Sequence, residues 1–264
     1  IAAFAVILSQ FPPLYTWFYK SEIELGTTPS FGMTPNRYGL SVSKPVSITN
    51  IGDELGQIHA VFLFIVQSDQ TLVEAMSAQS YRTKMGAMPL QSEWESFYGM
   101  TLRPGDQWSR LVVFNQNLSV EEQNRFAHLL DKLEDEEDRY DTRLEEEGYT
   151  WGDRGDSVPF FSMSDELFTK FRDAIQKRID WLVPGSYRLI EIAVTETGSY
   201  SSIYKFEVSD LHVRQLTRVL DIIQADPDGP TGLVRIKTWP VEGQVPASVR
   251  EKVKAYNKAM EPTQ

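Results

Sequence analysis

The chain has 264 residues, 41% hydrophobic and 24% charged, which suits a substantial folded core and excludes wholesale disorder or a many-span membrane protein. Its net charge of −11 argues against a broad nucleic-acid-binding surface, because such surfaces gather Lys and Arg. It contains no cysteine, which excludes disulfides, thiolate metal sites and cysteine nucleophiles.

The N-terminal segment is apolar and aromatic, and its first charge is Lys20. Residues 1–8 are too few to cross a hydrocarbon core, which takes about 20 residues of helix, but an aromatic cluster followed by a lysine is typical of a helix leaving a bilayer. We therefore predict that residues 1–20 are the end of a transmembrane helix and its interfacial segment. The residues expected to contact lipid are Ile1, Phe4, Val6, Ile7, Leu8, Phe11, Tyr15, Trp17, Phe18 and Tyr19.

Two other interpretations of this segment stay open, a strand or arm of a soluble domain and an uncleaved signal peptide. If the segment is an anchor, Glu22 and Glu24 follow it closely with Lys20 as the single nearby cation. This is a poor cytoplasmic flank, so the sequence favours a folded part on the extracytoplasmic, periplasmic side of the membrane.

Strand character begins after residue 20, in runs of β-branched and aromatic residues separated by Gly, Pro, Asn and Asp. In one run, apolar residues that include Leu40 and Val42 alternate with Ser and Thr, which predicts a strand with one buried face. Pro45 places that strand at an edge or a bulge. The run 58–66 is apolar on both faces, so we expect a central strand.

The next segments are less uniform. Residues 68–99 mix aromatic and polar residues and indicate short strands and loops, whereas residues 108–118 predict a clear strand. Further strands are expected over 187–195 and 203–208, and another short one precedes Pro240.

A helical hairpin is predicted at about residues 119–182. Ser119 and Glu122 form a capping box that begins a helix, and Gly148 ends it. The block 121–147 holds twelve acidic residues against four basic ones, a balance of −8 within the total of −11. A second amphipathic helix follows over about 165–181, and two more helices are expected over 211–223 and 246–260. The β-branched residues of 211–223 leave a strand open as the alternative there.

The order of strands, helical insertion, strands and helices predicts a β-rich α+β fold, without the β-α alternation of a parallel sheet. We expect an antiparallel, immunoglobulin-like β-sandwich over residues 21–264, carrying the helical hairpin and preceded by the anchor. The Cys…Trp…Cys core of antibody domains is absent, so this likeness concerns architecture and implies no activity.

No motif in the sequence predicts catalysis or metal binding. His59, His128 and His212 lie far apart, and neither a G-x-S-x-G elbow nor a glycine-rich phosphate loop occurs. We therefore expect no catalytic residues, no metal and no cofactor. Carboxylates are abundant, so a glycosidase-like pair, with carboxyls about 5 to 10 Å apart in a cleft, stays open.

The loop between the two helices of the hairpin is the one segment whose composition predicts a protein contact. It is rich in glycine and has aromatic residues at both ends, as interaction loops often do. The residues predicted to bind a partner are Tyr149, Trp151, Arg154, Asp156, Phe160 and Phe161.

These observations predict a single-pass, membrane-anchored, non-enzymatic accessory or structural subunit that binds protein partners in a membrane or cell-envelope complex. Its expected partners are the lipid bilayer, through the N-terminus, and other proteins, with no nucleic acid. The alternative is an envelope carbohydrate-active enzyme or carbohydrate-binding module that uses carboxylates and aromatic side chains.

Overall fold

The computed structural model describes residues 21–36, 39–83, 94–149, 161–222 and 233–260. Eight long strands dominate it: β2 (Ser30–Asn36), β3 (Gly39–Asn50), β4 (Gly56–Gln67), β5 (Leu72–Arg82), β8 (Gln107–Gln116), β9 (Gly185–Thr195), β10 (Gly198–Val208) and β11 (Val234–Pro240). The short strands are β1 (Ile23–Leu25), β6 (Trp94–Ser96) and β7 (Met100–Leu102). The helices are α2 (Val120–Glu146), α3 (Asp165–Ile179), α4 (Asp210–Ile222) and α5 (Ala247–Met260).

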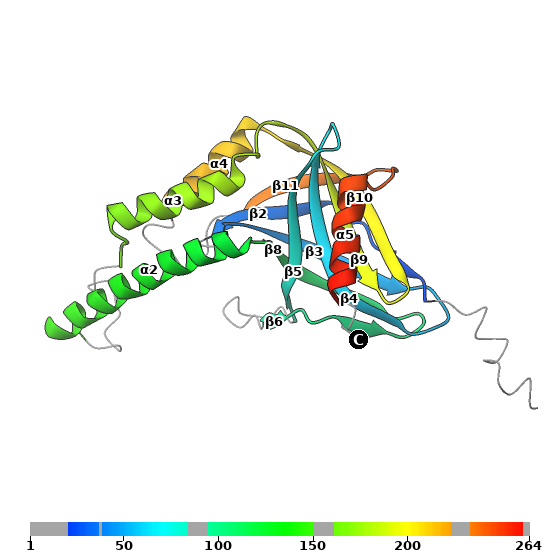
Figure 1. The fold of residues 1–264 in the computed structure, drawn as a ribbon, viewed down its shortest axis with the longest axis horizontal. Helices are drawn as coiled ribbons and strands as arrows, with labels where there is room; N and C mark the ends of the chain where they lie inside the picture. Colours follow the sequence, from blue (N-terminus) through cyan, green and yellow to red (C-terminus); the bar gives the residue numbers. More distant parts are fainter. Residues whose placement is uncertain (1–20, 37–38, 84–93, 150–160, 223–232, 261–264) are drawn as a thin grey trace, which may run out of the picture.

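The eight long strands form a closed antiparallel β-barrel (Figure 1). Around the barrel they follow the order β5, β8, β3, β2, β11, β10, β9 and β4, and β4 pairs with β5 to close the ring. β1 pairs with β3, β6 with β5 and β7 with β4. The barrel therefore brings together strands that are far apart in the sequence, such as β2 and β11.

The immunoglobulin-like sandwich predicted from the sequence is wrong. A sandwich consists of two sheets with open edges, whereas β5 pairs with β4 on one side and with β8 on the other. Alternating burial along a strand is the same in a sandwich and in a barrel, because both present one face to a shared core. The pattern of residues therefore predicted most of the long strands and could not determine how the sheet closes.

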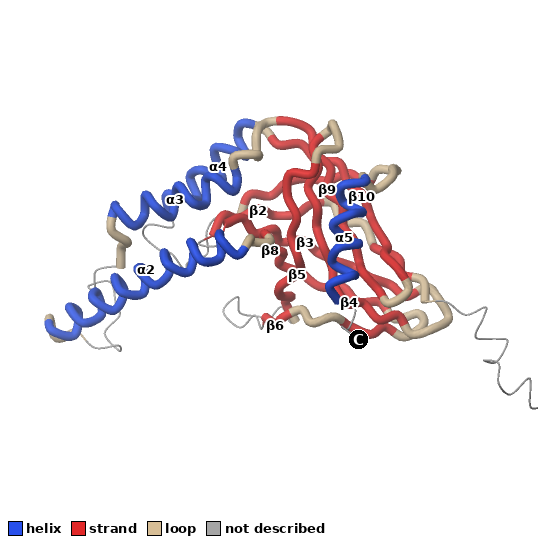
Figure 2. Tube along the Cα trace, viewed as in Figure 1, coloured by secondary structure: helices blue, strands red, loops and turns tan. Residues whose placement is uncertain are grey.

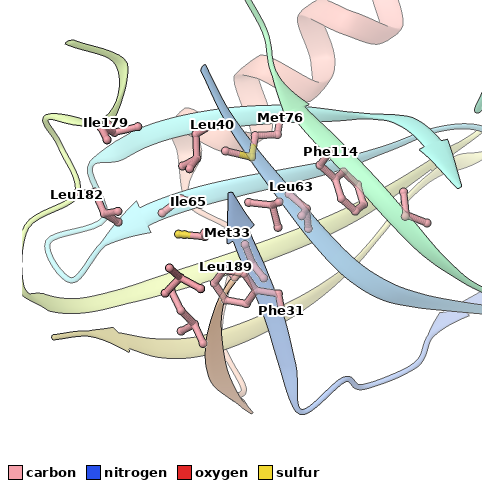
Figure 3. Packing of buried hydrophobic residues seen from close by; sticks show 14 of the residues in the cluster. Phe31, Met33, Leu40, Leu63, Ile65, Met76, Phe114, Ile179, Leu182 and Leu189 are labelled. Atoms are coloured by element: carbon pink, nitrogen blue, oxygen red, sulfur yellow. The ribbon is translucent and has the colours of Figure 1, made fainter. Parts of the chain in front are cut away.

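Apolar side chains fill the barrel interior. On β3, Leu40 and Val42 point inward and are no more than 1% exposed, which confirms the predicted alternation. They meet Phe114 from β8, Phe31 from β2 and Leu189 from β9 in one buried cluster (Figure 3). Eight strands enclose just enough space for such a layer of side chains. The barrel is thus a packed core.

β4 is buried on both faces, as the sequence predicted. Leu63 and Ile65 belong to the interior cluster, whereas Phe62 and Phe64 lie in a second cluster on the outside of the barrel. The outer cluster is covered by α5, whose Tyr256 ring meets Phe62 edge-on with centroids 4.6 Å apart (Figure 2). A helix on the outer face explains why this strand lacks polar alternation.

One strand was missed by sequence reasoning. β5 runs for eleven residues through the segment 68–99, which was predicted to contain only short strands and loops. Many of its residues are small or polar, including Ala75, Ser77 and Ala78, and have modest intrinsic preference for strands. β5 forms because β4 and β8 each supply a partner strand for its backbone.

The two ends of the barrel are built differently. At one end, α3 and α4 cover the interior, and Phe171 and Leu216 extend its buried cluster. At the opposite end, the buried Asn50 side chain donates hydrogen bonds to the carbonyl oxygens of Leu102 (3.0 Å) and Glu54 (2.6 Å). β3 runs from the helix-covered end to the opposite end, and its 12 residues measure about 36 Å along the tilted strand.

A charged pair lies inside the barrel. Lys44 of β3 forms an ion pair with Glu191 of β9, and neither side chain is more than 1% exposed. The Lys44 ammonium also lies 4.7 Å from the centre of the Tyr204 ring, and Tyr204 donates a hydrogen bond to the carbonyl of Gly26. Burial raises the pKa of the Glu191 carboxyl, and the charge of Lys44 opposes that rise. Because desolvating two charges is costly, the pair is better understood as fixing β3 against β9 than as a net source of stability.

We predict that Lys44→Met lowers the free energy of unfolding by about 3–5 kcal/mol, because it leaves the Glu191 carboxyl buried without its cation. Adding Glu191→Leu should recover most of this loss, since burying two apolar side chains does not require removing a charge from water. Guanidinium unfolding measures both changes.

The matched control is Lys205→Met on the outside of the barrel, where the Lys205–Glu207 pair is about half exposed. Lys205→Met should change the free energy of unfolding by no more than about 0.5 kcal/mol. If Lys44→Met with Glu191→Leu were as unstable as Lys44→Met alone, the unpaired Glu191 charge would not be the cause of the loss, and the prediction would be wrong.

Candidate functional site

α2 and α3 form an antiparallel hairpin, called here the helical arm, which extends away from the barrel (Figure 1). Two polar clamps join the helices: Arg178 binds Glu122 at the barrel, and Ser164 donates its backbone N–H (2.8 Å) and its hydroxyl to Glu136 farther out. The clamps are fourteen residues apart on each helix, so the two helices keep one register over about 21 Å. The apolar residues buried along this stretch are Phe126, Leu129 and Leu133 of α2 and Leu167, Phe171, Ala174 and Ile175 of α3.

The ends of α2 lie where the sequence predicted them. Ser119 and Glu122 form both bonds of the capping box, with Glu122 accepting from the Ser119 backbone N–H at 2.9 Å. At the other end Gly148 has φ +86°, and the next backbone N–H, of Tyr149, donates to the carbonyl of Leu144 at 2.9 Å. This C-cap needs a left-handed residue, which glycine supplies without strain.

α2 is longer than its partner. It continues for ten residues past Glu136, the residue that clamps the start of α3, which corresponds to about 15 Å of helix. Exposed carboxylates such as Glu134, Asp135 and Asp138 lie along the outer part of the helix. The outer arm is therefore a rigid, acidic projection.

The root of the arm is joined to the barrel by a chain of polar side chains that spans four elements. Gln116, at the end of β8, accepts hydrogen bonds on Oε1 from the Leu40 backbone N–H (2.8 Å) and from Arg178 Nε (2.9 Å). Its amide nitrogen donates to Glu74 of β5, while Arg178 of α3 binds Glu122 of α2. Every link is between residues that the sequence separates by at least 42 positions.

Close packing around Gln116 makes a glycine necessary nearby. Gly39 begins β3 with φ +127°, and a Cβ at this position would lie only 2.4 Å from Gln116 Oε1 and 3.2 Å from Arg178 Nε. Any side chain there would strain the backbone and displace the Gln116 amide. Gly39 therefore belongs to the root of the arm as much as to the strand.

Two carboxyl groups at the root have pKa values displaced in opposite directions. Burial raises the pKa of Glu74, and hydrogen bonds from Ala75 and Gln116 only partly offset it. Partial burial opposes ionisation of Glu122, but hydrogen bonds from Ser119 and the charge of Arg178 outweigh it and lower its pKa. Opposite shifts of this kind are found in acid–base pairs of enzymes.

The hydrogen bonds of these carboxyls indicate a structural role for both. Glu74 accepts from the Ala75 backbone N–H (3.0 Å) on one oxygen and from Gln116 on the other. Glu122 accepts from Arg178 on one oxygen and from Ser119 on the other. A general acid or nucleophile needs an oxygen free to reach its substrate, and each oxygen here is bound to a protein donor.

A hollow of about 350 Å³, called here the root pocket, lies between the arm and the barrel. Its walls include both carboxyls, the cations of Arg125, Lys177 and Arg178, and the rings of Phe126 and Trp181. A neighbouring hollow of about 450 Å³ on the far side of Gln116 is lined largely by amide side chains from Asn36, Gln79, Asn115 and Gln123. The volume of the root pocket is at the small end of the range for ligand sites.

The residues predicted from the sequence as sites are only partly described. The residues of segment 1–20 that were predicted to contact lipid lie outside the described residues, as do Trp151, Arg154, Asp156 and Phe160 of the predicted interaction loop. Of that loop, Tyr149 follows the α2 cap, and Phe161 packs against the Tyr140 ring with centroids 5.6 Å apart. Neither residue lines the root pocket.

Two further observations concern the described part of the chain. It contains no cluster of three or more metal-ligating side chains. None of its helices is both long and apolar enough to span a membrane, and the predicted single-pass segment falls in residues 1–20, outside that part.

Sequence reasoning missed the residues of the root pocket. Arg178 and Glu74 of the pocket, and Gln116 beside it, belong to no motif. Arg178 lay in a predicted amphipathic helix, Gln116 in a predicted strand, and Glu74 in the segment 68–99 that was predicted as short strands and loops. The only visible signal was the capping box, because Glu122 is both its third helical residue and the partner of Arg178.

The chain matches no protein-family model, and neither a curated protein nor a solved structure matches it significantly. Its function is therefore argued from its own geometry.

We predict that Arg178→Met destabilises the protein by about 2–4 kcal/mol, because it removes a buried cation that bridges Gln116 and Glu122. Denaturant unfolding gives the magnitude, and hydrogen exchange should show the largest loss of protection where α2 and α3 meet the barrel. Lys170→Gln, which removes an exposed cation from the same helix, should change stability by less than about 0.5 kcal/mol. Unchanged protection of both helices in Arg178→Met would contradict the proposed role of the root.

Proposed function

We propose that this protein is a non-enzymatic accessory subunit that is held at a membrane through residues 1–20 and presents the helical arm to a protein partner. The observation that carries the proposal is that the helical arm and residue 21 lie at opposite ends of the barrel. The arm leaves the helix-covered end of the barrel, whereas residue 21 joins the barrel at the opposite end.

The end that receives residue 21 has features suited to a membrane-facing surface. The Glu22 carbonyl accepts a hydrogen bond from Ile51 N–H at 2.8 Å, which fixes the incoming chain beside the β3–β4 turn. In that turn Ile51 is 52% exposed and Leu55 is 63% exposed. Exposed aliphatic side chains beside an apolar segment can enter the interfacial region of a bilayer.

The barrel suits the role of a rigid spacer. Its interior is filled with side chains, and its strands are paired on both sides around the ring. β3 measures about 36 Å along its own direction, and because barrel strands are tilted, the axial distance between the proposed membrane end and the arm is somewhat shorter. A partner contacting the outer arm would therefore be engaged well away from the lipid surface.

The arm suits a protein partner because it is firmly held and strongly charged. Its two clamps and its link to Gln116 fix its direction, so little conformational entropy is lost when a partner binds. The balance of −8 over residues 121–147 favours a partner with a basic surface, since complementary charge speeds and orients association.

A carbohydrate-active enzyme is the second candidate. The observation that favours it is the presence of Glu74 and Glu122, with opposite pKa shifts, in the wall of one pocket. The occupied oxygens of both carboxyls argue against it. Hydrolysis of an envelope polysaccharide that Glu74→Gln abolishes without unfolding the protein would favour the enzyme.

The first prediction from the proposed function concerns orientation at the membrane. The chain has no cysteine, so Leu55→Cys and Glu146→Cys each give one labelling site for an environment-sensitive fluorophore. In the native full-length chain bound to vesicles, lipid nitroxides should quench the label at position 55 strongly and the label at position 146 very little. The reason is that these positions lie at opposite ends of the molecule.

Removal of residues 1–20 serves as the control and should release the protein from the vesicles. Flotation of the shortened chain with the vesicles, or equal quenching at both positions, would refute the proposed arrangement.

The second prediction concerns the arm. Neutralising three exposed acids by Glu134→Gln, Asp135→Asn and Asp138→Asn should reduce recovery of the partner roughly tenfold in a detergent pull-down followed by mass spectrometry. These carboxylates were chosen because no clamp uses them, so the arm should stay folded.

The matched control neutralises Glu24, Asp53 and Glu54 at the opposite end of the barrel, which changes the net charge equally. Equal losses in both variants would show a general charge effect and would remove the argument for the arm.

A further inference from the structure

We infer that the root pocket is a binding site for a small, singly charged carboxylate with an apolar body. The pocket lies between α2, α3 and the ends of β5 and β8, and the inference does not rest on the proposed membrane attachment.

The first argument is that the uncommitted polar groups of the pocket are donors or cations. Lys177 is exposed and forms no ion pair with the described part of the chain. Arg125 has only a long, exposed contact of 3.9 Å to Glu121. The indole Nε1 of Trp181 is buried and has no acceptor in hydrogen-bonding geometry among the described residues, although it lies close enough to Glu74 to lower that carboxyl's pKa slightly.

The second argument is that each carboxylate oxygen in the wall already accepts a hydrogen bond from the protein. The oxygens of Glu74 are bound by Ala75 and Gln116, and those of Glu122 by Arg178 and Ser119. A ligand that offers hydrogen-bond donors or positive charge would therefore compete with these protein donors for the same oxygens. A ligand that offers oxygen acceptors and negative charge would meet the groups that are free.

Two properties of the pocket wall limit further the chemical class of ligand that fits. Arg178 is neutralised by Glu122, which leaves Arg125 and Lys177 as the cations available to a ligand. With carboxyl groups also in the wall, a singly charged carboxylate fits better than a doubly charged phosphate. Phe126, Val73 and the Trp181 ring give the pocket an apolar side, which suits a hydrocarbon or aromatic body.

A carboxylate of this kind can come from a small molecule or from the C-terminus of a peptide. The chemistry recognised is the same, a planar anion held by cationic N–H groups beside an apolar wall. The two sources differ in the group that carries the carboxylate, so probes of each type distinguish them.

Isothermal titration calorimetry on the full chain tests the inference with two matched pairs of probes. The first pair is 3-phenylpropionate and 3-phenylpropionamide, and the second is N-acetyl-Gly-Leu with a free carboxylate and the same peptide as its amide. At least one acid should bind saturably with Kd on the order of 1 mM or tighter, and its amide should bind at least about tenfold more weakly. The acid that binds identifies the source.

Variants then locate the site. Arg125→Gln combined with Lys177→Gln should weaken binding at least about tenfold, and Trp181→Phe should weaken it several-fold while keeping the ring. Lys170→Gln and Lys132→Gln together remove the same charge from the same two helices without touching the pocket and should leave binding unchanged. The inference is overturned if neither acid binds, if an amide binds as well as its acid, or if the pocket and control variants weaken binding equally.

Discussion

The pairing of β5 with both β4 and β8 closes the sheet, and the rest of the structure depends on this closure. Once the ring is closed, the inward side chains of eight strands must fill one enclosed volume, which explains the layer that contains Phe31, Met33 and Phe114. Closure also gives the molecule two distinct ends joined by β3, with α2, α3 and α4 at one end and the first described residues at the other.

The helical arm is held by polar contacts at its root and by apolar packing along its length. Gln116 is central to this arrangement because its single amide contacts β3, β5 and α3. A directional network of this kind fixes an angle between helix and barrel that apolar contact alone leaves free. The same network uses up the carboxylate oxygens of the root and leaves the cations of Arg125 and Lys177 facing the pocket, so the stability of the arm and the proposed ligand preference have one origin.

Some elements could be predicted because their cause is local. The capping box at Ser119 and the glycine at position 148 set the bounds of α2, and the alternation along β3 marked its buried face. β5 could not be predicted in this way, since its small and polar residues form a strand only between two partner strands. The interaction loop and the membrane segment stay predictions, because most of the loop and all of residues 1–20 lie outside the described residues.

The sequence by itself determined the class of most segments, the acidic helical hairpin and the absence of thiol chemistry, because these depend on composition and on contacts within a few residues. The tertiary structure decided that the sheet closes into a barrel, that Lys44 meets Glu191 inside it, and that Gln116 links Glu74, Arg178 and Glu122 into one network at the root of the arm. These pairings join positions between 42 and 147 residues apart. They arise from strand register and helix docking, which no local pattern of residues encodes.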